Sequence, residues 1–314
     1  MKLIVTGASG FIGRNVLLRA PRDWEIVALY NQTADLPSFV AAHRLTNVIA
    51  ARCDLLDGDD VCAIVQRFGH ADAALYLAAN GDPAASAARP LWDLQLNSVA
   101  VVTFLEHASI DRIVFMSSGA VYDGLRGDVT PATPVNPVLP YAIAKLASER
   151  YVTFFAERRR SLASYANIRF FGAYGPYEAP RKITTRWLRT VVAGQREFTI
   201  RGNGQNLIDL MHVDDAVDAL LRVVGDPSFS GTVDLAGGAP VTVDAVVTAM
   251  ARALGVEMTV LHDGEVPEYI EFRSADTTLR DRFHFVPSVS FEDGIRRFAA
   301  FFAAGAQHAA GGQA

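Results

Sequence analysis

The chain has 314 residues and a formal net charge of −5; half of its residues are hydrophobic and a fifth are charged. This length allows one large α/β unit or two lobes, and the acidic balance gives no support to nucleic-acid binding, which usually shows a basic face. No apolar run reaches the ~18 residues of a transmembrane helix, and the N-terminus enters a strand pattern without a signal region. We therefore expect a cytoplasmic protein with no membrane or nucleic-acid partner. The two cysteines, Cys53 and Cys62, lack metal-ligand spacing, so we expect no metal site.

Short apolar runs alternate with longer amphipathic segments through the first half of the chain. Apolar runs that are separated by helices indicate a parallel sheet covered on both faces, and right-handed crossovers make such a sheet doubly wound. We therefore predict an α/β, Rossmann-type dinucleotide-binding domain over residues 1–171. The expected strands are 2–6, 25–29, 48–50, 74–77, 112–116 and 164–171, and the expected helices are 11–20, 34–44, 58–68, 88–108 and 139–160.

The regular alternation of apolar runs and amphipathic segments ends near residue 172, where a loop rich in Gly, Pro and Tyr begins. We predict a smaller, discontinuous substrate-binding lobe over 172–302, with segments near 205–236 returning to the main sheet. The tail over 303–314 is small and polar, and we expect it to be frayed. The expected elements of this half are helices 184–194, 212–224 and 241–254 and strands 198–200 and 232–235.

A glycine-rich loop, TGASGFIG at residues 6–13, follows the first strand and opens a helix. Gly7 allows the tight turn, Gly10 lets a pyrophosphate approach the backbone, and Gly13 permits close packing of the helix on the sheet. The helix N-terminus then supplies amide donors to the phosphates. This context predicts a dinucleotide site rather than a plain glycine turn.

The second strand does not end on the acidic residue that usually binds the ribose hydroxyls of NAD. It ends at Tyr30-Asn31, so NAD and NADP both stay open. Arg14 and Asn31 are candidates to lie near a 2′-phosphate, although either fits equally as a surface residue. Asp54, after the third strand, is placed either to meet the adenine region or to cap the following helix.

Tyr141 and Lys145 lie one turn apart on one face of a predicted helix. An ammonium lowers the pKa of a nearby phenol, which can then act as a base near neutral pH. This is the only YxxxK in a chain with three lysines. Ser118 follows the strand 112–116 at the edge where open parallel sheets bind ligands, so we assign it a role in proton movement. For Ser117 we favour a turn residue.

Eight motifs occur along the chain in a fixed order. Through these motifs and their order, the chain resembles the extended short-chain dehydrogenase/reductase family, and within it the nucleotide-sugar epimerases and dehydratases. The resemblance covers roughly residues 1–295. The motifs are TGASGFIG (6–13), CDL (53–55), LYLAAN (75–80), SSGAVY (117–122), YAIAK (141–145), RFFGAYGP (169–176), GNGQNLIDLMHVDD (202–215) and RSAD (273–276).

The resemblance implies a role for each matching side chain. Tyr141 would be the base toward a sugar hydroxyl, Lys145 would bind the cofactor ribose and tune Tyr141, and Ser118 would contact the substrate and assist the proton. Arg273 would bind the nucleotide diphosphate, since a guanidinium makes bidentate contacts; its alternative is a surface salt bridge to Glu271 or Asp276. The cofactor, NAD or NADP, would be bound by Gly7, Gly10, Phe11, Ile12, Gly13, Asn31, Asp54, Leu55, Ala78, Ala79, Asn97, Tyr141 and Lys145.

The chain departs from the family pattern in its substrate motifs. Gly172 stands where members often have Asn, and Ile208 stands where many carry Arg before the Asp. Arg181 or Lys182 could compensate from the preceding loop. We therefore expect a nucleotide-sugar substrate with unusual contacts.

The residues after Ser118 separate the reactions of the family. Its 4,6-dehydratases have Asp-Glu there, because eliminating water needs an added acid and base, whereas Gly119 and Ala120 cannot transfer a proton. We therefore expect an epimerase that acts at C4 through a transient 4-keto intermediate. An NADPH-dependent reductase of a 4-keto-6-deoxy sugar is the alternative, and a non-catalytic dinucleotide sensor is a third. The long apolar helices 88–108 and 139–160 match the pairing helices of related dimers, so we predict a homodimer.

Overall fold

A seven-stranded sheet forms the centre of the protein. The computed structural model describes residues 1–265 and 270–311, with side chains up to Ala304. All pairings in the sheet are parallel, and the strand order is β12-β7-β5-β4-β1-β2-β3. This order confirms the predicted doubly wound sheet. The strands are β1 (Lys2–Thr6), β2 (Glu25–Tyr30), β3 (Val48–Arg52), β4 (Ala71–Tyr76), β5 (Ile110–Ser118), β7 (Ser164–Phe170) and β12 (Gly231–Leu235).

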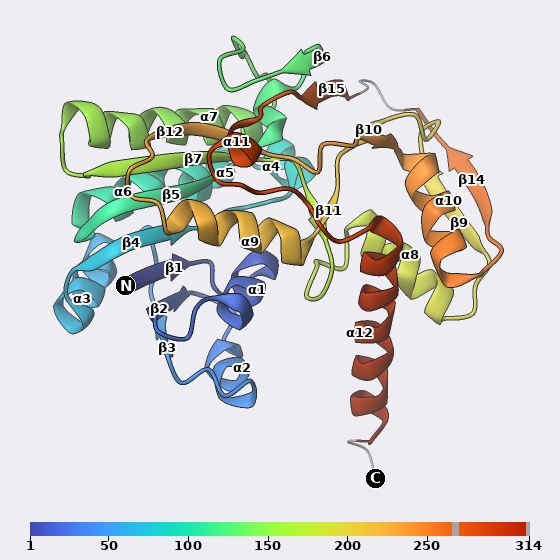
Figure 1. The fold of residues 1–314 in the computed structure, drawn as a ribbon, viewed down its shortest axis with the longest axis horizontal. Coiled ribbons are helices and arrows are strands. Elements are labelled where there is room, and N and C mark those ends of the chain that lie inside the picture. The colour runs from blue at the N-terminus through green and yellow to red at the C-terminus, as the bar shows by residue number, and fades with distance from the viewer. Residues whose placement is uncertain (266–269, 312–314) are drawn as a thin grey trace.

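Helices cover both faces of this sheet (Figure 1). Successive side chains of a strand point to opposite faces, and in β1 the side chain of Leu3 packs in one core while that of Ile4 packs in the other. The first core is closed by α1 (Phe11–Arg19), α2 (Leu36–Ala42) and α9 (Val213–Val224). The second is closed by α3 (Gly58–Phe68), α6 (Ala100–His107) and α7 (Pro140–Thr153).

The expected helix 88–108 is broken into shorter pieces. Arg89 has a non-helical backbone between two of them, and Pro90, which lacks an N–H donor, begins a new helix. A π-helical turn then precedes α6, and a second one follows α7. The pieces that lead to α6 are α4 (Pro83–Ala88), α5 (Pro90–Leu94) and η1 (Gln95–Val99). The turn that follows α7 is η3 (Phe154–Arg158).

A small lobe lies beyond the carboxyl edge of the sheet and has its own core, which includes Trp187, Phe198 and Phe298. Its main elements are α8 (Ile183–Val192), β9 (Glu197–Arg201), α10 (Val243–Leu254), β14 (Thr259–Asp263) and α12 (Phe291–Gly311). The remaining short elements are η2 (Gly119–Tyr122), β6 (Arg126–Val129), β8 (Ala173–Tyr174), β10 (Leu207–Ile208), β11 (Met211–His212), β13 (Val241–Thr242), β15 (Glu271–Ser274) and α11 (Thr278–Asp281).

Two further features bear on the sequence predictions. Helix α12 runs to Gly311, so most of the segment expected to be frayed is helical, consistent with its high alanine content. Residues 312–314 lie outside the described residues. None of the helices in the described part of the chain combines the length and hydropathy that crossing a bilayer requires.

Candidate active site

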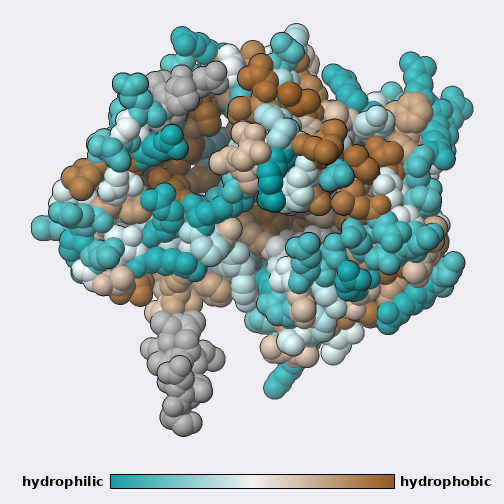
Figure 2. Space-filling model, turned by 180° about the vertical axis from the view of Figure 1, so that it is seen from behind, coloured by the Kyte–Doolittle hydropathy of each residue, from teal (hydrophilic) through white to brown (hydrophobic). Residues whose placement is uncertain are grey.

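A cavity of about 520 Å³ lies where the carboxyl ends of β5 and β7 face the small lobe. This is the edge at which open parallel sheets bind their ligands. The face shown in Figure 2 is hollowed between the two parts of the molecule, and hydrophobic residues show inside the hollow. Ser118, Tyr141 and Lys145 all line the cavity, so the structure brings together the three side chains assigned to catalysis.

The glycine loop lies at the same edge, between β1 and α1. Gly7 has a φ of +62°, and a Cβ there would lie 2.8 Å from the amide nitrogen of Ala78. A Cβ on Gly13 would lie 2.5 Å from the carbonyl oxygen of Gly7. Both positions therefore require glycine. The loop brings the N-terminus of α1 to the cavity, where Phe11 is one of the lining residues. Its free amides suit a dinucleotide diphosphate, so this site fits the cofactor.

The loop after β3 holds two of the predicted cofactor contacts. Oδ1 of Asp54 accepts a hydrogen bond from the amide of Leu56 at 3.0 Å, and the Leu55 side chain packs against the second core. The residue that caps α3 is Asp57, whose carboxylate accepts a hydrogen bond from the amide of Asp59. The alternative of Asp54 as helix cap is therefore wrong, and its place beside the adenine stays a prediction.

Asn97 clamps the loop that follows β4. Its Oδ1 accepts from the amide of Asn80 at 2.9 Å, and its Nδ2 donates to Oδ1 of Asp93 at 2.6 Å. Asp93 is fully buried and also accepts from Nδ2 of Asn80 at 2.8 Å. The side-chain amide of Asn97 thus bonds to other residues of the protein and is not among the groups that line the cavity. It positions the loop that contains Ala78 and Ala79.

Ser118 and Tyr141 are hydrogen-bonded at the cavity wall. Burial raises the pKa of the Tyr141 phenol, and the hydrogen bond with Ser118, followed by the charge of Arg181, lowers it in part. The Ser118 hydroxyl also accepts from the amide of Ala120 at 3.1 Å, which fixes its position at the end of β5. Because burial dominates, the pKa of Tyr141 in this structure lies above its ordinary value, contrary to the lowering expected from the sequence.

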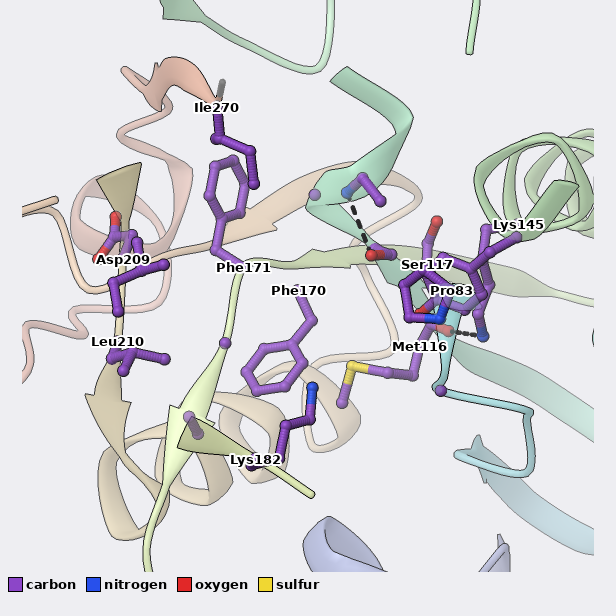
Figure 3. Close-up of a pocket in the computed structure, with 18 of the residues that line it drawn as sticks. Pro83, Met116, Ser117, Lys145, Phe170, Phe171, Lys182, Asp209, Leu210 and Ile270 are labelled. Atoms are coloured by element: carbon purple, nitrogen blue, oxygen red, sulfur yellow. Dashed lines mark hydrogen bonds between the residues drawn. The ribbon is translucent and has the colours of Figure 1, made fainter. Parts of the chain in front are cut away.

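Lys145 is buried beside the end of β5. Its ammonium donates to the carbonyl oxygen of Met116 at 2.8 Å, as Figure 3 shows, and lies 5.0 Å from the ring centre of Phe115. Burial lowers the pKa of Lys145 to about 8, while Asp93 and then Glu149 oppose this effect. The residue can therefore change its charge in the pH range where an enzyme works.

Ser117 is a strand residue in a buried polar network, so its assignment to a turn is wrong. It is 2% exposed, and its hydroxyl donates to Oε1 of Glu149 at 2.5 Å. Glu149 forms a paired contact with Arg169, whose Nε and Nη2 lie 3.0 and 2.8 Å from the two carboxylate oxygens. The network joins β5, α7 and β7 directly behind the cavity.

The small-lobe wall of the cavity is mostly apolar. Gly172 has a φ of +154°, which favours glycine, and a Cβ there would lie 2.9 Å from Cδ2 of Leu210, so an Asn would strain the backbone and require the Leu210 side chain to move. Ile208 lines the wall where the family pattern has Arg. Asp209 is buried, which raises its pKa, and its carboxylate accepts from the amide of Gly238 at 3.1 Å.

The structure separates the cations that we considered for substrate binding, beginning with Arg273. Arg273 is exposed and ion-paired with Asp128 at 2.5 Å. It is a neighbour of the cavity-lining Phe272 in β15, so strand alternation points it away from the cavity. Its assignment to the substrate is therefore not supported, and its salt-bridge partner is neither Glu271 nor Asp276.

Arg181 and Lys182 lie at the other wall. Arg181 donates to the carbonyl oxygen of Gly81 at 2.7 Å and lies 3.5 Å from Asp82. Lys182 lines the cavity, and Figure 3 shows its amine directed toward Phe170. Of these cations, Lys182 is the one that enters the cavity.

Two carboxylates at the cavity were missed in the sequence. Asp123 follows η2 and acts on the pKa of Tyr141, and Glu178 accepts hydrogen bonds from Thr184 and Thr185. Burial raises the pKa of Glu178. Asp123 lies only five residues beyond Ser118, a spacing that could have drawn attention to it. Glu178 has no such signal, because its position depends on the fold of the loop before α8.

Comparison with known proteins gives concordant matches. A model of the NAD dependent epimerase/dehydratase family matches residues 3–234. A UDP-glucose 4-epimerase of Mycolicibacterium smegmatis is 26% identical over 313 residues, covering 96% of this chain and 98% of the relative. A dTDP-glucose 4,6-dehydratase of the same organism is 30% identical over 244 residues, covering 74% and 71% of the two chains.

A solved structure supports the same fold. The UDP-glucose 4-epimerase of Thermotoga maritima, determined with UDP-glucose, is similar with a TM-score of 0.85 over 96% of this chain and 99% of that one. Its sequence identity of 23% limits this likeness to the fold.

Proposed function

The chain belongs to the NAD dependent epimerase/dehydratase family, as its motifs predict, and on that premise we propose that it is a nucleotide-sugar epimerase that uses NAD or NADP. In the proposed reaction, C4 of the sugar is oxidised to a transient ketone and reduced again from the opposite face. The observation that carries the proposal is the meeting of Ser118, Tyr141 and Lys145 in one cavity beside the glycine loop.

Each of these residues has a part in moving one proton. The Tyr141 oxygen takes the proton of the sugar C4 hydroxyl during oxidation and returns one during reduction. The Ser118 hydroxyl bonds to the phenol and holds it toward the cavity. The Lys145 ammonium, held by the carbonyl of Met116, would add positive charge that favours the phenolate, which is the form of Tyr141 that can take the proton.

Gly7, Gly10 and Gly13 with the N-terminus of α1 would hold the diphosphate of the cofactor. The chemistry that the bound nicotinamide would supply is reversible hydride transfer with the sugar carbon, so that no cofactor would be consumed overall. Lys145 would also contact the cofactor ribose, as the family pattern implies.

The relatives and the cation at the cavity support our choice of substrate class. The relatives are named for UDP-glucose and dTDP-glucose, and we assign a nucleotide sugar to this chain as well. Lys182, rather than Arg273, is the cation that we assign to the substrate diphosphate. The apolar wall at Ile208 and Leu210 is consistent with a substrate whose contacts differ from the usual family pattern.

Epimerisation is preferred over dehydration because of the residues after Ser118. Gly119 and Ala120 both line the cavity, and neither carries a proton-transfer group. Asp123 also lines the cavity. Since a dehydratase is among the relatives, the products must be examined for loss of water.

A reductase of a keto-sugar is the second candidate. The observation that favours it is the end of β2, where Asn31 hydrogen-bonds Arg52 in place of the carboxylate typical of NAD binding. NADPH is a common donor for net reduction. A reductase would consume one NADPH for each sugar, whereas an epimerase would consume none.

The first experiment is mass spectrometry of the purified protein and of its reactions with UDP- and dTDP-sugars. We expect retained NAD or NADP and a product of unchanged mass. Tyr141→Phe should retain the cofactor and lose at least about a hundredfold in turnover, in line with general acid–base catalysis. Full activity of this variant would refute the role of Tyr141, and a cofactor-binding protein inert toward every such sugar would support the sensor instead.

A further inference from the structure

The strand ends that would face the adenosine ribose carry an amide and a guanidinium. β2 ends at Tyr30, and Asn31 follows where an acidic residue binds the two ribose hydroxyls of NAD. β3 pairs with β2 so that Arg52 lies opposite Tyr30. From this position the Arg52 guanidinium donates a hydrogen bond to Oδ1 of Asn31 at 3.3 Å.

The two arginines near this edge differ in how firmly they are held. Arg14 is fixed: its Nε donates to the carbonyl of Ser9 at 2.9 Å, its Nη2 lies 2.6 Å from a carboxylate oxygen of Asp35, and its guanidinium lies 4.7 Å from the ring centre of Phe39. Arg52 forms no ion pair with any carboxylate in the described part of the chain, and its bond to Asn31 uses one of its five N–H donors.

We propose that Asn31 and Arg52 form a subsite for the 2′-phosphate of NADP(H), so that the protein binds NADP(H) in preference to NAD(H). The inference rests on the proposed function only in taking the glycine loop as the dinucleotide site. A guanidinium binds a phosphate through charge-assisted, bidentate bonds. Because Oδ1 of Asn31 accepts from Arg52, its Nδ2 is left to donate to a phosphate oxygen.

Asp35 is the first acidic residue after β2, and it is the group most able to take the NAD-type contact instead. Its carboxylate is 62% exposed and paired with Arg14. Binding the ribose hydroxyls would require it to turn from that pair. Its charge is also offset by Arg14, so it repels a 2′-phosphate less than a free carboxylate would.

Binding measurements test the subsite without any turnover. The purified full-length protein is first freed of any retained cofactor and then titrated with NADPH and with NADH by calorimetry, and 2′,5′-ADP is compared with 5′-ADP as a competitor. We expect NADPH to bind roughly ten- to a hundredfold more tightly than NADH, the range for hydrogen bonds to a charged group. The preference should weaken as salt is added.

Three variants locate the effect. Arg52→Ala should lose most of the preference by weakening NADPH binding while leaving NADH binding unchanged, and Asn31→Asp should reverse it by placing a carboxylate at the ribose. Arg67→Ala is the matched control, since Arg67 is an exposed arginine in the last turn of α3 whose guanidinium lies over the ring of Phe68. It should bind both cofactors as the wild type does.

Two results would overturn the proposal: wild-type protein that binds NADH as tightly as NADPH, or Arg52→Ala that weakens both cofactors equally. Binding of NADH alone would overturn this inference and leave the proposed function standing. Binding of neither cofactor would overturn both.

Discussion

The ammonium of Lys145 donates a hydrogen bond to the main-chain carbonyl of Met116 at 2.8 Å. This bond joins α7, which carries Tyr141, to β5, which ends at Ser118. Since β5 is rigid at the centre of the sheet, the bond also fixes where α7 presents the phenol. The lysine therefore has a structural part in the site in addition to its charge.

The pH dependence of turnover should report the charge of Lys145. Burial lowers its pKa to about 8. Lys145 is therefore protonated well below that pH and loses its charge as the pH rises through it. If the ammonium supports Tyr141, kcat falls above about pH 8. Lys145→Arg, whose guanidinium stays charged, should lower kcat but remove this fall. A wild-type profile that keeps rising to pH 10 would contradict the role of the charge.

The buried pair of Glu149 and Arg169 should dominate the stability of the region behind the site. Both side chains are 4% exposed, so Glu149→Gln leaves an uncompensated guanidinium in the interior and should cost roughly 3–5 kcal/mol in the free energy of unfolding. Urea denaturation measures this loss. Glu106→Gln removes a half-exposed ion pair with Arg159 and should cost below about 1 kcal/mol. Equal effects of the two substitutions would contradict the account.

Asp234 should make the protein less stable as the pH rises. Burial raises its pKa to about 7, so the folded state holds a proton that the unfolded chain releases near pH 4. The contribution of Asp234 to the free energy of unfolding is fully present below about pH 4 and is lost as the pH rises through 7. The Asn side chain of Asp234→Asn cannot ionise, so at pH 8 the free energy of unfolding of this variant should exceed that of the wild type by ~1 to ~4 kcal/mol.

The comparison at low pH is the control for Asp234. Thermal unfolding of both proteins should show little difference at pH 4, because the protonated carboxyl of the wild type and the amide of Asn each offer one carbonyl oxygen and one hydrogen-bond donor to the hydroxyls of Tyr122 and Ser274. A gain of the same size at pH 4 and pH 8 would show that titration is not the cause.

The homodimer prediction concerns an exposed apolar surface. Hydrophobic residues gather on the side of the molecule where α5 and α7 lie, which is in view in Figure 2. Leu91→Glu together with Phe154→Glu should convert the dimer to a monomer in light scattering, because burying two carboxylates is unfavourable. The exposed residues are Leu91, Leu94, Val99, Ile143, Tyr151 and Phe154.

A substitution elsewhere controls for the added charge. Val286 is 63% exposed and lies outside α5 and α7, so Val286→Glu should leave the oligomeric state unchanged. A wild-type protein that is monomeric at micromolar concentration would contradict the prediction.

Most of the main sheet could be predicted from the sequence, because its strands are continuous apolar runs separated by helices. The glycine loop and the Tyr141–Lys145 pair are local patterns, and their positions follow from one strand or one helix turn. The broken helix before α6 was missed, because the apolar pattern continues through Pro90 and the π-helical turn.

The features that could not be predicted from the sequence depend on contacts between segments that are distant along the chain. Arg273 faces away from the cavity because β15 pairs with β6, a short polar strand 145 residues earlier at the Asp128 contact. Ser117 was assigned to a turn because its partner, Glu149, lies 32 residues away. Arg52 reaches Asn31 only through the pairing of β3 with β2. None of these contacts has a local signature.

The central claim is that the enzyme oxidises and reduces the same sugar carbon. The direct measurement is the incubation of the purified protein with UDP-glucose deuterated at C4, with the product analysed by chromatography and mass spectrometry. The account predicts a C4 epimer that keeps the deuterium, with no loss of water and no net consumption of NAD(P)H. A product lighter by one water, or a product that forms only with equimolar consumption of NADPH, would contradict it.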